Sequence, residues 1–200
     1  MFTGLVEETG RIVSLGKTPE GLWRMEVEAR VIVDGLALGD SVATNGCCLT
    51  ATRIDGRRVS FDLLDETIRK TGFHTVRAGD PVNLERSVTP STRLGGHFVT
   101  GHVDGVGTVE IFEPRGANHL LRIRPPAAFL RYLVYKGCVT VDGMSLTVAE
   151  VHDETFDLWI IPHTLEITNL AGRRAGDIIN LEFDILAKYV ERLARFPARV

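Results

Sequence analysis

The sequence predicts an all-β protein made of two tandem copies of one small closed β-barrel, followed by a single helix. Three observations lead to this prediction. The chain matches itself when it is shifted by 97 residues, so that Gly4 falls on Gly101 and Gly46 falls on Gly143. Each copy contains short runs in which apolar and polar residues alternate. Only the tail shows the periodicity of a longer helix, with apolar residues on one face.

The repeat is long enough for each copy to form a domain. The run AGDPVNLE at 78–85 falls on AGDIINLE at 175–182, and Thr67 and Thr71 fall on Thr164 and Thr168. Solenoid repeats are shorter, about 20–50 residues, so this period indicates duplicated domains. We predict a first barrel over residues 1–94, a second over 95–186 and a C-terminal helix over 187–200.

Alternating residues mark the strands. Trp23, Met25 and Val27 alternate with charged residues, which is typical of a half-buried strand. Residues 59–63 repeat the pattern after a predicted Asp55-Gly56 hairpin turn, and residues 179–185 do so in the second copy. No long helical segments separate these strands, so a closed barrel fits better than a parallel sheet.

Two helices and one weaker candidate are expected. A short one is predicted at 126–135, with Pro126 near its start and Gly137 as its stop, and its counterpart at 29–38 has weaker signals. In the tail, an apolar stripe of helical spacing is formed by Ile185, Leu186, Tyr189, Val190 and Leu193. This tail helix is expected to dock on its own barrel or to pack against another subunit.

Composition excludes several classes of protein. The 23 basic and 26 acidic residues give a net charge of -3 without a long block of like charge, which argues against a nucleic-acid groove. No window approaches the about 18 apolar residues of a membrane span. Cys47, Cys48 and Cys138 form neither a disulfide framework nor a CxxC metal pattern. We therefore expect a soluble, cytoplasmic protein.

Several chemical motifs fail on inspection. Gly101, Gly105 and Gly107 have the wrong spacing for a dinucleotide site. His97 and His102 are five residues apart without a third ligand at metal-like spacing. Ser145, His102 and Asp184 could form a catalytic triad, but no GxSxG motif is present. We expect neither a metal nor a cofactor.

The two copies differ at polar positions, where their chemistry has diverged. From the first copy to the second, the differences are Leu5 to His102, Gly39 to Lys136, Cys48 to Ser145 and Ser87 to Asp184. The second copy thus has reactive groups where the first has mostly inert ones. Similar pockets with unlike side chains indicate one type of ligand bound in two roles.

Each of these residues also has a structural interpretation. His102 could be a turn histidine, although its ordinary pKa near 6.5 suits proton transfer. Ser145 and Thr147 could be plain strand hydroxyls, Cys48 a buried apolar thiol, and Lys136 a complement to a helix dipole. Asp184 stands between two apolar residues, which argues against a solvated face. The candidate catalytic residues are Cys48, His102, Ser145, Thr147 and Asp184.

Six segments together resemble the riboflavin synthase family of the α-chain type. They are MFTGLVEE, NGCCLT, GGHFVTGHVDG, DGMSLTV, IPHTL and INLEFDILAKYVER, and the match covers essentially the whole chain. The resemblance implies two six-stranded Greek-key barrels and a C-terminal helix, assembled as a homotrimer. It implies an active site between the first barrel of one subunit and the second barrel of another.

The resemblance also implies a reaction. Two molecules of 6,7-dimethyl-8-ribityllumazine exchange a four-carbon unit, which yields riboflavin and 5-amino-6-(D-ribitylamino)uracil without metal or cofactor. His102 is expected to help remove a proton from the 7-methyl group. Ser145, or a water near Thr147 and Asp184, is expected to add to the ring of the second molecule. An association with lumazine synthase is a further expectation.

The resemblance places ligand contacts in both barrels. Contacts of the first barrel are expected from Gly4, Leu5, Val6, Cys48, Leu49, Thr50, Asp62, Leu63, Leu64, Asp65, Glu66 and Thr67. Contacts of the second are expected from Gly101, His102, Val103, Ser145, Leu146, Thr147, Ile161, Pro162, His163, Thr164, Leu165 and Glu166. Phe2 is expected to cover a ring, Ser41 to add a contact, and Lys136 to reach in from a neighbouring subunit.

Two rival interpretations stay open. The same double barrel occurs in non-catalytic lumazine- or flavin-binding antenna proteins of luminous bacteria. Those proteins look degraded at the catalytic positions, whereas this chain keeps all five candidate residues, which favours an enzyme. An unrelated barrel that serves as an interaction module would have to explain why the polar groups differ so systematically between the copies.

Overall fold

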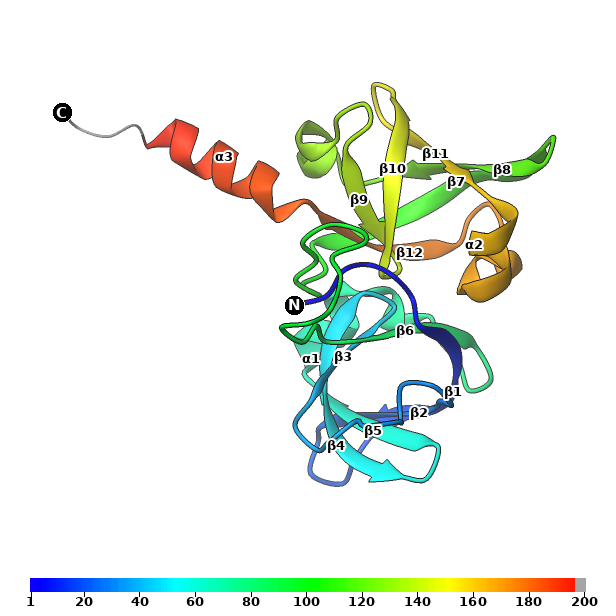
Figure 1. Ribbon diagram of the computed structural model, residues 1–200, viewed down its shortest axis with the longest axis vertical. Helices are drawn as coiled ribbons and strands as arrows, with labels where there is room; N and C mark the ends of the chain where they lie inside the picture. Colours follow the sequence, from blue (N-terminus) through cyan, green and yellow to red (C-terminus); the bar gives the residue numbers. More distant parts are fainter. Residues whose placement is uncertain (197–200) are drawn as a thin grey trace.

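The computed structural model describes residues 1–196 and contains two closed antiparallel barrels of six strands each, followed by a helix. This confirms the predicted fold class. In Figure 1 the first barrel, blue to cyan, lies below the second, green to orange, and the N-terminus lies at their junction. The last four residues of the predicted tail helix, 197–200, lie outside the described residues.

The strands of the first barrel lie between residues 8 and 86. They are β1 (Glu8–Lys17), β2 (Trp23–Glu28), β3 (Ser41–Thr44), β4 (Cys47–Asp55), β5 (Arg58–Leu63) and β6 (Pro81–Arg86). Their order around the barrel is β1-β2-β5-β4-β3-β6, and β6 pairs with β1 to close it. The connection is of the Greek-key type, because β3 lies between β4 and β6 rather than beside β2. The helices α1 (Asp65–Lys70) and η1 (Gly72–His74), a 3-10 turn, follow β5.

The second barrel repeats this path. Its strands are β7 (Gly105–Arg115), β8 (Asn118–Arg124), β9 (Cys138–Val141), β10 (Met144–Val151), β11 (Phe156–Ile160) and β12 (Ile178–Phe183). Its short helices are η2 (Ala127–Tyr132), α2 (Pro162–Ile167) and η3 (Asn169–Gly172). The order β10-β11-β8-β7-β12-β9 is that of the first barrel, so a complete barrel was duplicated.

Each barrel has its own apolar core, built from the alternating residues. Met25, Val27 and Phe61 are fully buried in the first barrel, and Ile179 and Leu181 in the second. Two details differ from the prediction. The hairpin turn is Gly56-Arg57, because Asp55 pairs with Arg58. Strand β12 ends at Phe183, so residue 185 belongs to the helix rather than the strand.

The helices differ more from the prediction than the strands do. The segment expected at 126–135 forms only the 3-10 helix η2, and 29–38 contains turns but no helix. The tail helix α3 (Ile185–Arg195) forms, two residues earlier than predicted, and points away from the second barrel (Figure 1). Its apolar residues Leu186, Tyr189, Val190 and Leu193 are exposed. Within residues 1–196 no helix is long and apolar enough to cross a bilayer.

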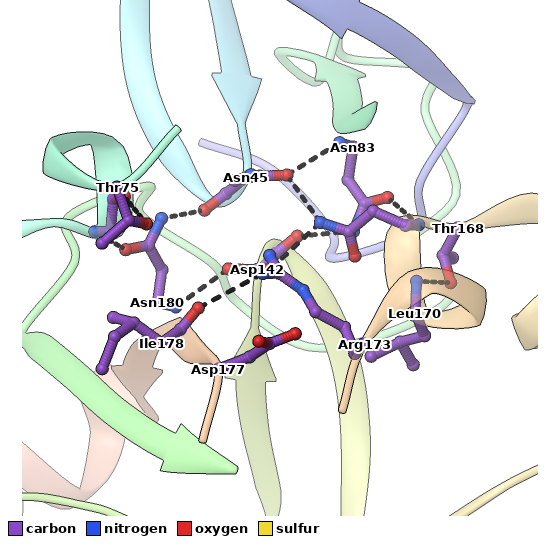
Figure 2. A network of polar contacts seen from close by, with 12 residues as sticks. Asn45, Thr75, Asn83, Asp142, Thr168, Leu170, Arg173, Asp177, Ile178 and Asn180 are labelled. Atoms are coloured by element: carbon purple, nitrogen blue, oxygen red, sulfur yellow. Dashed lines mark hydrogen bonds and ion pairs between the residues drawn. The ribbon is translucent and has the colours of Figure 1, made fainter. Parts of the chain in front are cut away.

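A buried polar network joins the barrels around a local two-fold relation (Figure 2). Asn83 Oδ1 accepts a bond of 2.8 Å from the N–H of Asn169, and Asn180 Oδ1 accepts one of 2.7 Å from the N–H of Gly72. The Nδ2 groups of Asn83 and Asn180 donate to the carbonyls of Asp142 and Asn45 at 2.9 and 2.8 Å. Each bond has a partner 97 residues away, so the duplicated strands also duplicate their interface.

Two glycines meet at the centre of this interface. A Cβ placed on Gly46 would lie 2.7 Å from the backbone nitrogen of Gly143, and one on Gly143 would lie 2.8 Å from that of Gly46. Both glycines have positive φ angles, +78° and +84°. No side chain fits there, so the close approach of the barrels depends on glycine at both positions.

Candidate functional site

Each barrel receives a short segment from the other half of the chain. The carbonyl of Gly101, before β7, accepts a bond of 2.8 Å from the N–H of Cys48 in β4. The carbonyl of Gly4, before β1, accepts one of 2.7 Å from the N–H of Ser145 in β10. The two halves therefore exchange residues 3–6 and 100–103, which we call the crossing segments.

The side chains of the crossing segments follow the same exchange. Val103 packs against the core of the first barrel, and Val6 packs against the core of the second. A Cβ on Gly101 would lie 2.6 Å from Cys48 Cβ, and one on Gly4 would lie 2.6 Å from Ser145 Cβ. Both glycines have a φ of +78°. Only glycine fits this approach in this backbone conformation.

This exchange corrects the expected grouping of the site residues. Gly4, Leu5 and Val6 were expected in the first barrel's site, and 101–103 in the second's. The structure shows the reverse for most of them, because Gly4 and Val6 contact the second barrel and residues 101–103 contact the first. Leu5 is the exception, since it lines a cavity with the first-barrel residues Ser41 and Arg86. His102 therefore belongs with Cys48, so the structure does not assemble the triad of Ser145, His102 and Asp184 that the sequence analysis rejected.

A cavity of about 270 Å³ lies where the site of the first barrel is predicted. It is lined by Cys47, Cys48, Leu64, Glu66, Thr67, Lys70, Thr71, Gly101, His102 and Val103. His102 and Leu64 are exposed at its rim, and Cys48 is half-buried. The structure thus brings together seven of the predicted residues, four from the first barrel and three from the incoming segment.

The remaining residues predicted for this site have other surroundings. Leu49 and Leu63 are buried in the barrel core. Asp62 forms an ion pair with Arg24 at 2.7 Å. Asp65 lies 3.2 Å from Lys17 Nζ and accepts a bond from Trp23. Thr50 is exposed on β4, where it pairs with Ser41 of β3.

The residues predicted for the second barrel's site lie on β10 and around the start of α2. Ser145 and Leu146 are half-buried on β10 and Thr147 is exposed. The residues predicted around the start of α2 are Ile161, Pro162, His163, Thr164, Leu165 and Glu166. Thr164 and Leu165 are half-buried and the others are exposed. Ile161 precedes α2 as Leu64 precedes α1, so both sites have the same frame.

Ser145 has a histidine partner that the sequence analysis missed. His97 Nδ1 lies 2.7 Å from Ser145 Oγ, and His97 Nε2 lies 3.2 Å from Thr140 Oγ1. Burial lowers the pKa of His97, while the negative charge of Asp184 acts in the opposite direction. A neutral imidazole in this position can accept the proton of the serine hydroxyl when Nε2 carries its own proton toward Thr140.

The adjacent cysteines have different environments. Burial raises the pKa of Cys47 to about 12, so this thiol keeps its proton. Cys48 is half-buried and opens into the cavity of the first barrel. All three cysteines, including Cys138, are free. Both adjacent cysteines line this cavity, and Cys48 is the more exposed of the two.

Asp184 is the N-cap residue of α3. Its side chain caps the N-terminus of α3 and accepts a bond of 2.9 Å from the N–H of Leu186. Lys136 lies four residues past the end of η2, so it does not complement a helix dipole as considered from the sequence. It is exposed, has a φ of +64°, and its ammonium lies 5.1 Å from the centre of the Tyr135 ring.

Phe2 and Ser41 do not line the first-barrel cavity. Phe2 is fully buried, pairs with Val99 and packs against Ala43. Ser41 lines a separate cavity of about 530 Å³ that also includes Leu5 and Arg86. Phe2 lines another cavity, of about 280 Å³, with Leu94 and Phe98, so its contact with a ligand ring stays a prediction.

One cluster outside these sites has the geometry of metal ligands. Donor atoms of Glu150, His152 and Asp157 lie within 4.8 Å of one another. Asp157 already accepts two bonds from Arg122, at 2.6 and 2.7 Å, and lies 3.1 Å from His152. The guanidinium supplies the positive charge that these groups need, so the cluster is an ion-pair network on the barrel wall.

Comparison with known proteins identifies the family. The lumazine binding domain family matches residues 3–87 and 100–184. The riboflavin synthase of Actinobacillus pleuropneumoniae is 40% identical over 199 residues, which cover 99% of this chain and 92% of that protein. The chain belongs to the riboflavin synthase family. Relatives in this family extend to Schizosaccharomyces pombe, at 42% identity over 96% of this chain and 93% of the relative.

Solved structures agree with membership in the riboflavin synthase family. LumP complexed with riboflavin is similar with a TM-score of 0.83 at 29% identity, over 92% of this chain and 99% of that chain. LumP complexed with 6,7-dimethyl-8-(1'-D-ribityl) lumazine has a TM-score of 0.82 at 27% identity, with the same coverage. The riboflavin synthases are thus more similar in sequence to this chain than LumP is.

Proposed function

We propose that this chain is a riboflavin synthase. Two molecules of 6,7-dimethyl-8-ribityllumazine bind in the two sites. One donates four carbons and leaves as 5-amino-6-(D-ribitylamino)uracil, and the other becomes riboflavin. The observation that carries the proposal is the pair of duplicated sites with unlike reactive groups: Cys48 with His102 in one, and Ser145 with His97 in the other.

The shared frame of the sites supports identical ligands. The crossing segments bring a backbone carbonyl to Cys48 and to Ser145 in the same geometry, with bonds of 2.8 and 2.7 Å. Thr67 and Thr164 stand at equivalent places on α1 and α2, where a hydroxyl can bind a ribityl chain. Holding both molecules in one complex converts a bimolecular encounter into a reaction between bound partners.

The unlike groups divide the chemistry. His102, at the rim of the first site, takes a proton from the acidic 7-methyl group of the lumazine. Ser145 adds to the electron-poor ring of the other molecule while His97 accepts the hydroxyl proton through Nδ1. Asp184 favours the imidazolium that results, because its negative charge acts on His97. Cys48 and Thr147 are the further candidate contacts with the reacting rings.

The reaction also requires the two sites to face each other, and we propose a homotrimer for this purpose. The cavity of about 270 Å³ is smaller than the pockets that enclose drug-sized ligands, which measure about 300–1,000 Å³. A second subunit would complete it, with Lys136 as the neighbour's contribution. The exposed apolar stripe of α3 gives the subunits a surface to share. Light scattering of the purified chain should give three times its mass of 22.0 kDa.

Incubation of the chain with the lumazine alone tests the activity. Riboflavin fluorescence should rise with one riboflavin formed for two lumazines consumed, without an added cofactor. His102→Gln and Ser145→Ala should bind the lumazine and turn it over slowly. Full turnover by both variants would refute the assigned roles, and no riboflavin from the unmodified chain would refute the enzyme.

A carrier of lumazine or flavin is the second candidate function, because LumP complexes share the fold with TM-scores above 0.8. The same incubation separates the two functions, since a carrier binds the lumazine without consuming it. A cytoplasmic location and an association with lumazine synthase complete the proposal. Co-sedimentation with purified lumazine synthase tests the association, and free chain in the supernatant would refute it.

A further inference from the structure

Each crossing segment is held by a buried glutamate. Glu182 Oε1 accepts bonds from the N–H and the hydroxyl of Thr100, at 2.7 and 2.6 Å, and Oε2 accepts one of 2.9 Å from the N–H of Gly101. Glu85 Oε1 accepts the same two groups of Thr3 at 2.7 and 2.8 Å, and Oε2 accepts the N–H of Gly4 at 3.0 Å. Each carboxylate thus uses both oxygens on one segment.

Burial of these two glutamates costs free energy, because a carboxylate loses its hydration. Glu85 is 5% exposed and Glu182 is 2% exposed, and neither forms an ion pair within 4 Å among the described residues. Burial raises the pKa of both carboxyls, although the bonds from the crossing segments act in the opposite direction. A buried carboxylate needs such donors to offset its lost hydration.

Each glutamate acts on the barrel to which it does not belong. Glu182 lies on β12 of the second barrel, but the segment that it holds delivers the Gly101 carbonyl to Cys48 and places His102 at the first cavity. Glu85 lies on β6 of the first barrel, but its segment delivers the Gly4 carbonyl to Ser145. The chain of contacts therefore runs from one barrel to the other barrel's site.

We propose that Glu182 and Glu85 are positioning residues that set the geometry of the opposite barrel's ligand site: Glu182 that of Cys48 and His102, and Glu85 that of Ser145. The inference rests on the proposed function for the identity of the ligand. It predicts a crossed pattern of effects, in which a change in one barrel damages the site of the other. A glutamate that only stabilised its own barrel would damage its own barrel's site.

Glu182→Gln is the main variant, because it keeps the shape but places an N–H donor against one of the crossing segment's donors. Glu85→Gln is its counterpart. Asn180→Ala is the matched control, since Asn180 is buried on the same strand and bonds across the interface to Gly72 and Asn45. Glu182→Asp, which keeps the charge on a shorter side chain, is the second variant should the amide destabilise the fold.

The first readout needs no ligand. Hydrogen exchange followed by mass spectrometry should show faster exchange in Glu182→Gln for peptides that contain residues 100–103 and Cys48. Glu85→Gln should show it for residues 3–6 and Ser145. Unchanged exchange in these peptides, or equal acceleration by Asn180→Ala, would overturn the positioning role.

The second readout reports the ligand site. Iodoacetamide should label Cys48, and bound lumazine should protect it, as peptide mass spectrometry can resolve from Cys47. In Glu182→Gln the lumazine concentration for half protection should rise about 10-fold or more, as expected for loss of a charged hydrogen bond. In Glu85→Gln it should change by less than about 2-fold, while riboflavin formation falls.

Glu182→Asp should change the same peptides and the same Cys48 protection as Glu182→Gln, but by smaller amounts. Equal loss of Cys48 protection in Glu85→Gln and Glu182→Gln would contradict the crossed pattern. If lumazine fails to protect Cys48 in the unmodified chain and no riboflavin forms, the proposed function fails. The exchange data still decide the positioning role in that case.

Discussion

The Nδ1 atom of His97 lies 2.7 Å from the hydroxyl oxygen of Ser145. In the proposed reaction this imidazole takes the serine proton. His97→Asn should keep a hydrogen bond to Ser145 but cannot accept the proton, so kcat should fall about 10²- to 10⁴-fold. Steady-state riboflavin formation measures this.

The pair should also act as a unit. The double variant His97→Asn with Ser145→Ala should be no slower than the slower single variant, because either change removes the same proton transfer. Thr140→Val is the control, because it removes only the contact of 3.2 Å between Thr140 and His97 Nε2. Its kcat should fall less than that of either single variant. Additive losses in the double variant would show that the two residues act separately.

Acid should destabilise the chain through His97. Burial lowers the pKa of this imidazole below its usual value of 6.5 in the folded chain, whereas the unfolded chain keeps that value. The unfolded chain therefore takes up a proton first as the pH falls through 6.5. The contribution of His97 to stability is intact above 6.5 and is lost as the pH falls toward the lower, folded pKa.

Thermal unfolding between about pH 8 and pH 5 checks this sign. The Tm of the unmodified chain should fall more steeply below pH 6.5 than that of His97→Asn. The acid limb of its kcat profile should likewise lie below 6.5. Parallel Tm curves for the two proteins would contradict the assignment to His97.

Two substitutions of Asp184 separate its cap from its charge. Asp184→Ala removes the acceptor for Leu186 N–H and should cost about 0.5–2 kcal/mol of unfolding free energy. Asp184→Asn keeps the cap, because asparagine and aspartate cap helices equally well, so stability should hold. It should nevertheless lower kcat, because the charge near His97 is gone. Denaturant unfolding and turnover measure the two effects, and full activity in Asp184→Asn would leave the cap as the residue's whole role.

The glycine contact between the barrels should be sensitive to a single methyl group. Gly46→Ala places its Cβ 2.7 Å from the backbone nitrogen of Gly143 and should lower the unfolding free energy by more than the about 1–2 kcal/mol of a left-handed alanine. Gly56→Ala is the matched control, because Gly56 also has a positive φ but has open space around it. Equal losses in the two variants would show that the contact adds nothing.

The sequence was sufficient to predict the two barrels. Duplication is visible directly in the residues, and alternation such as Met25, Val27 and Phe61 reports burial without knowledge of the partner strand. Strand ends were harder to predict. The alternation of β12 continues in phase to residue 185, and only the cap at Asp184 ends the strand.

Comparison of the chain with itself could not predict which barrel each crossing segment contacts. Such a comparison aligns Gly4 with Gly101 but does not say which barrel each one contacts, since both arrangements have the same internal symmetry. His97 was missed for a related reason. It lies in the linker and has no partner residue 97 positions earlier, so the differences between the copies could not reveal it.

The exchange of the crossing segments also bears on ancestry. A gene that encoded one repeat would make a symmetric dimer in which each subunit's crossing segment packs on the other subunit's barrel, with the same residues at both sites. After fusion of two such genes, the two crossing segments could change independently. One copy could then acquire a histidine at a position where the other copy kept an apolar residue. His102 and its equivalent, Leu5, show this difference.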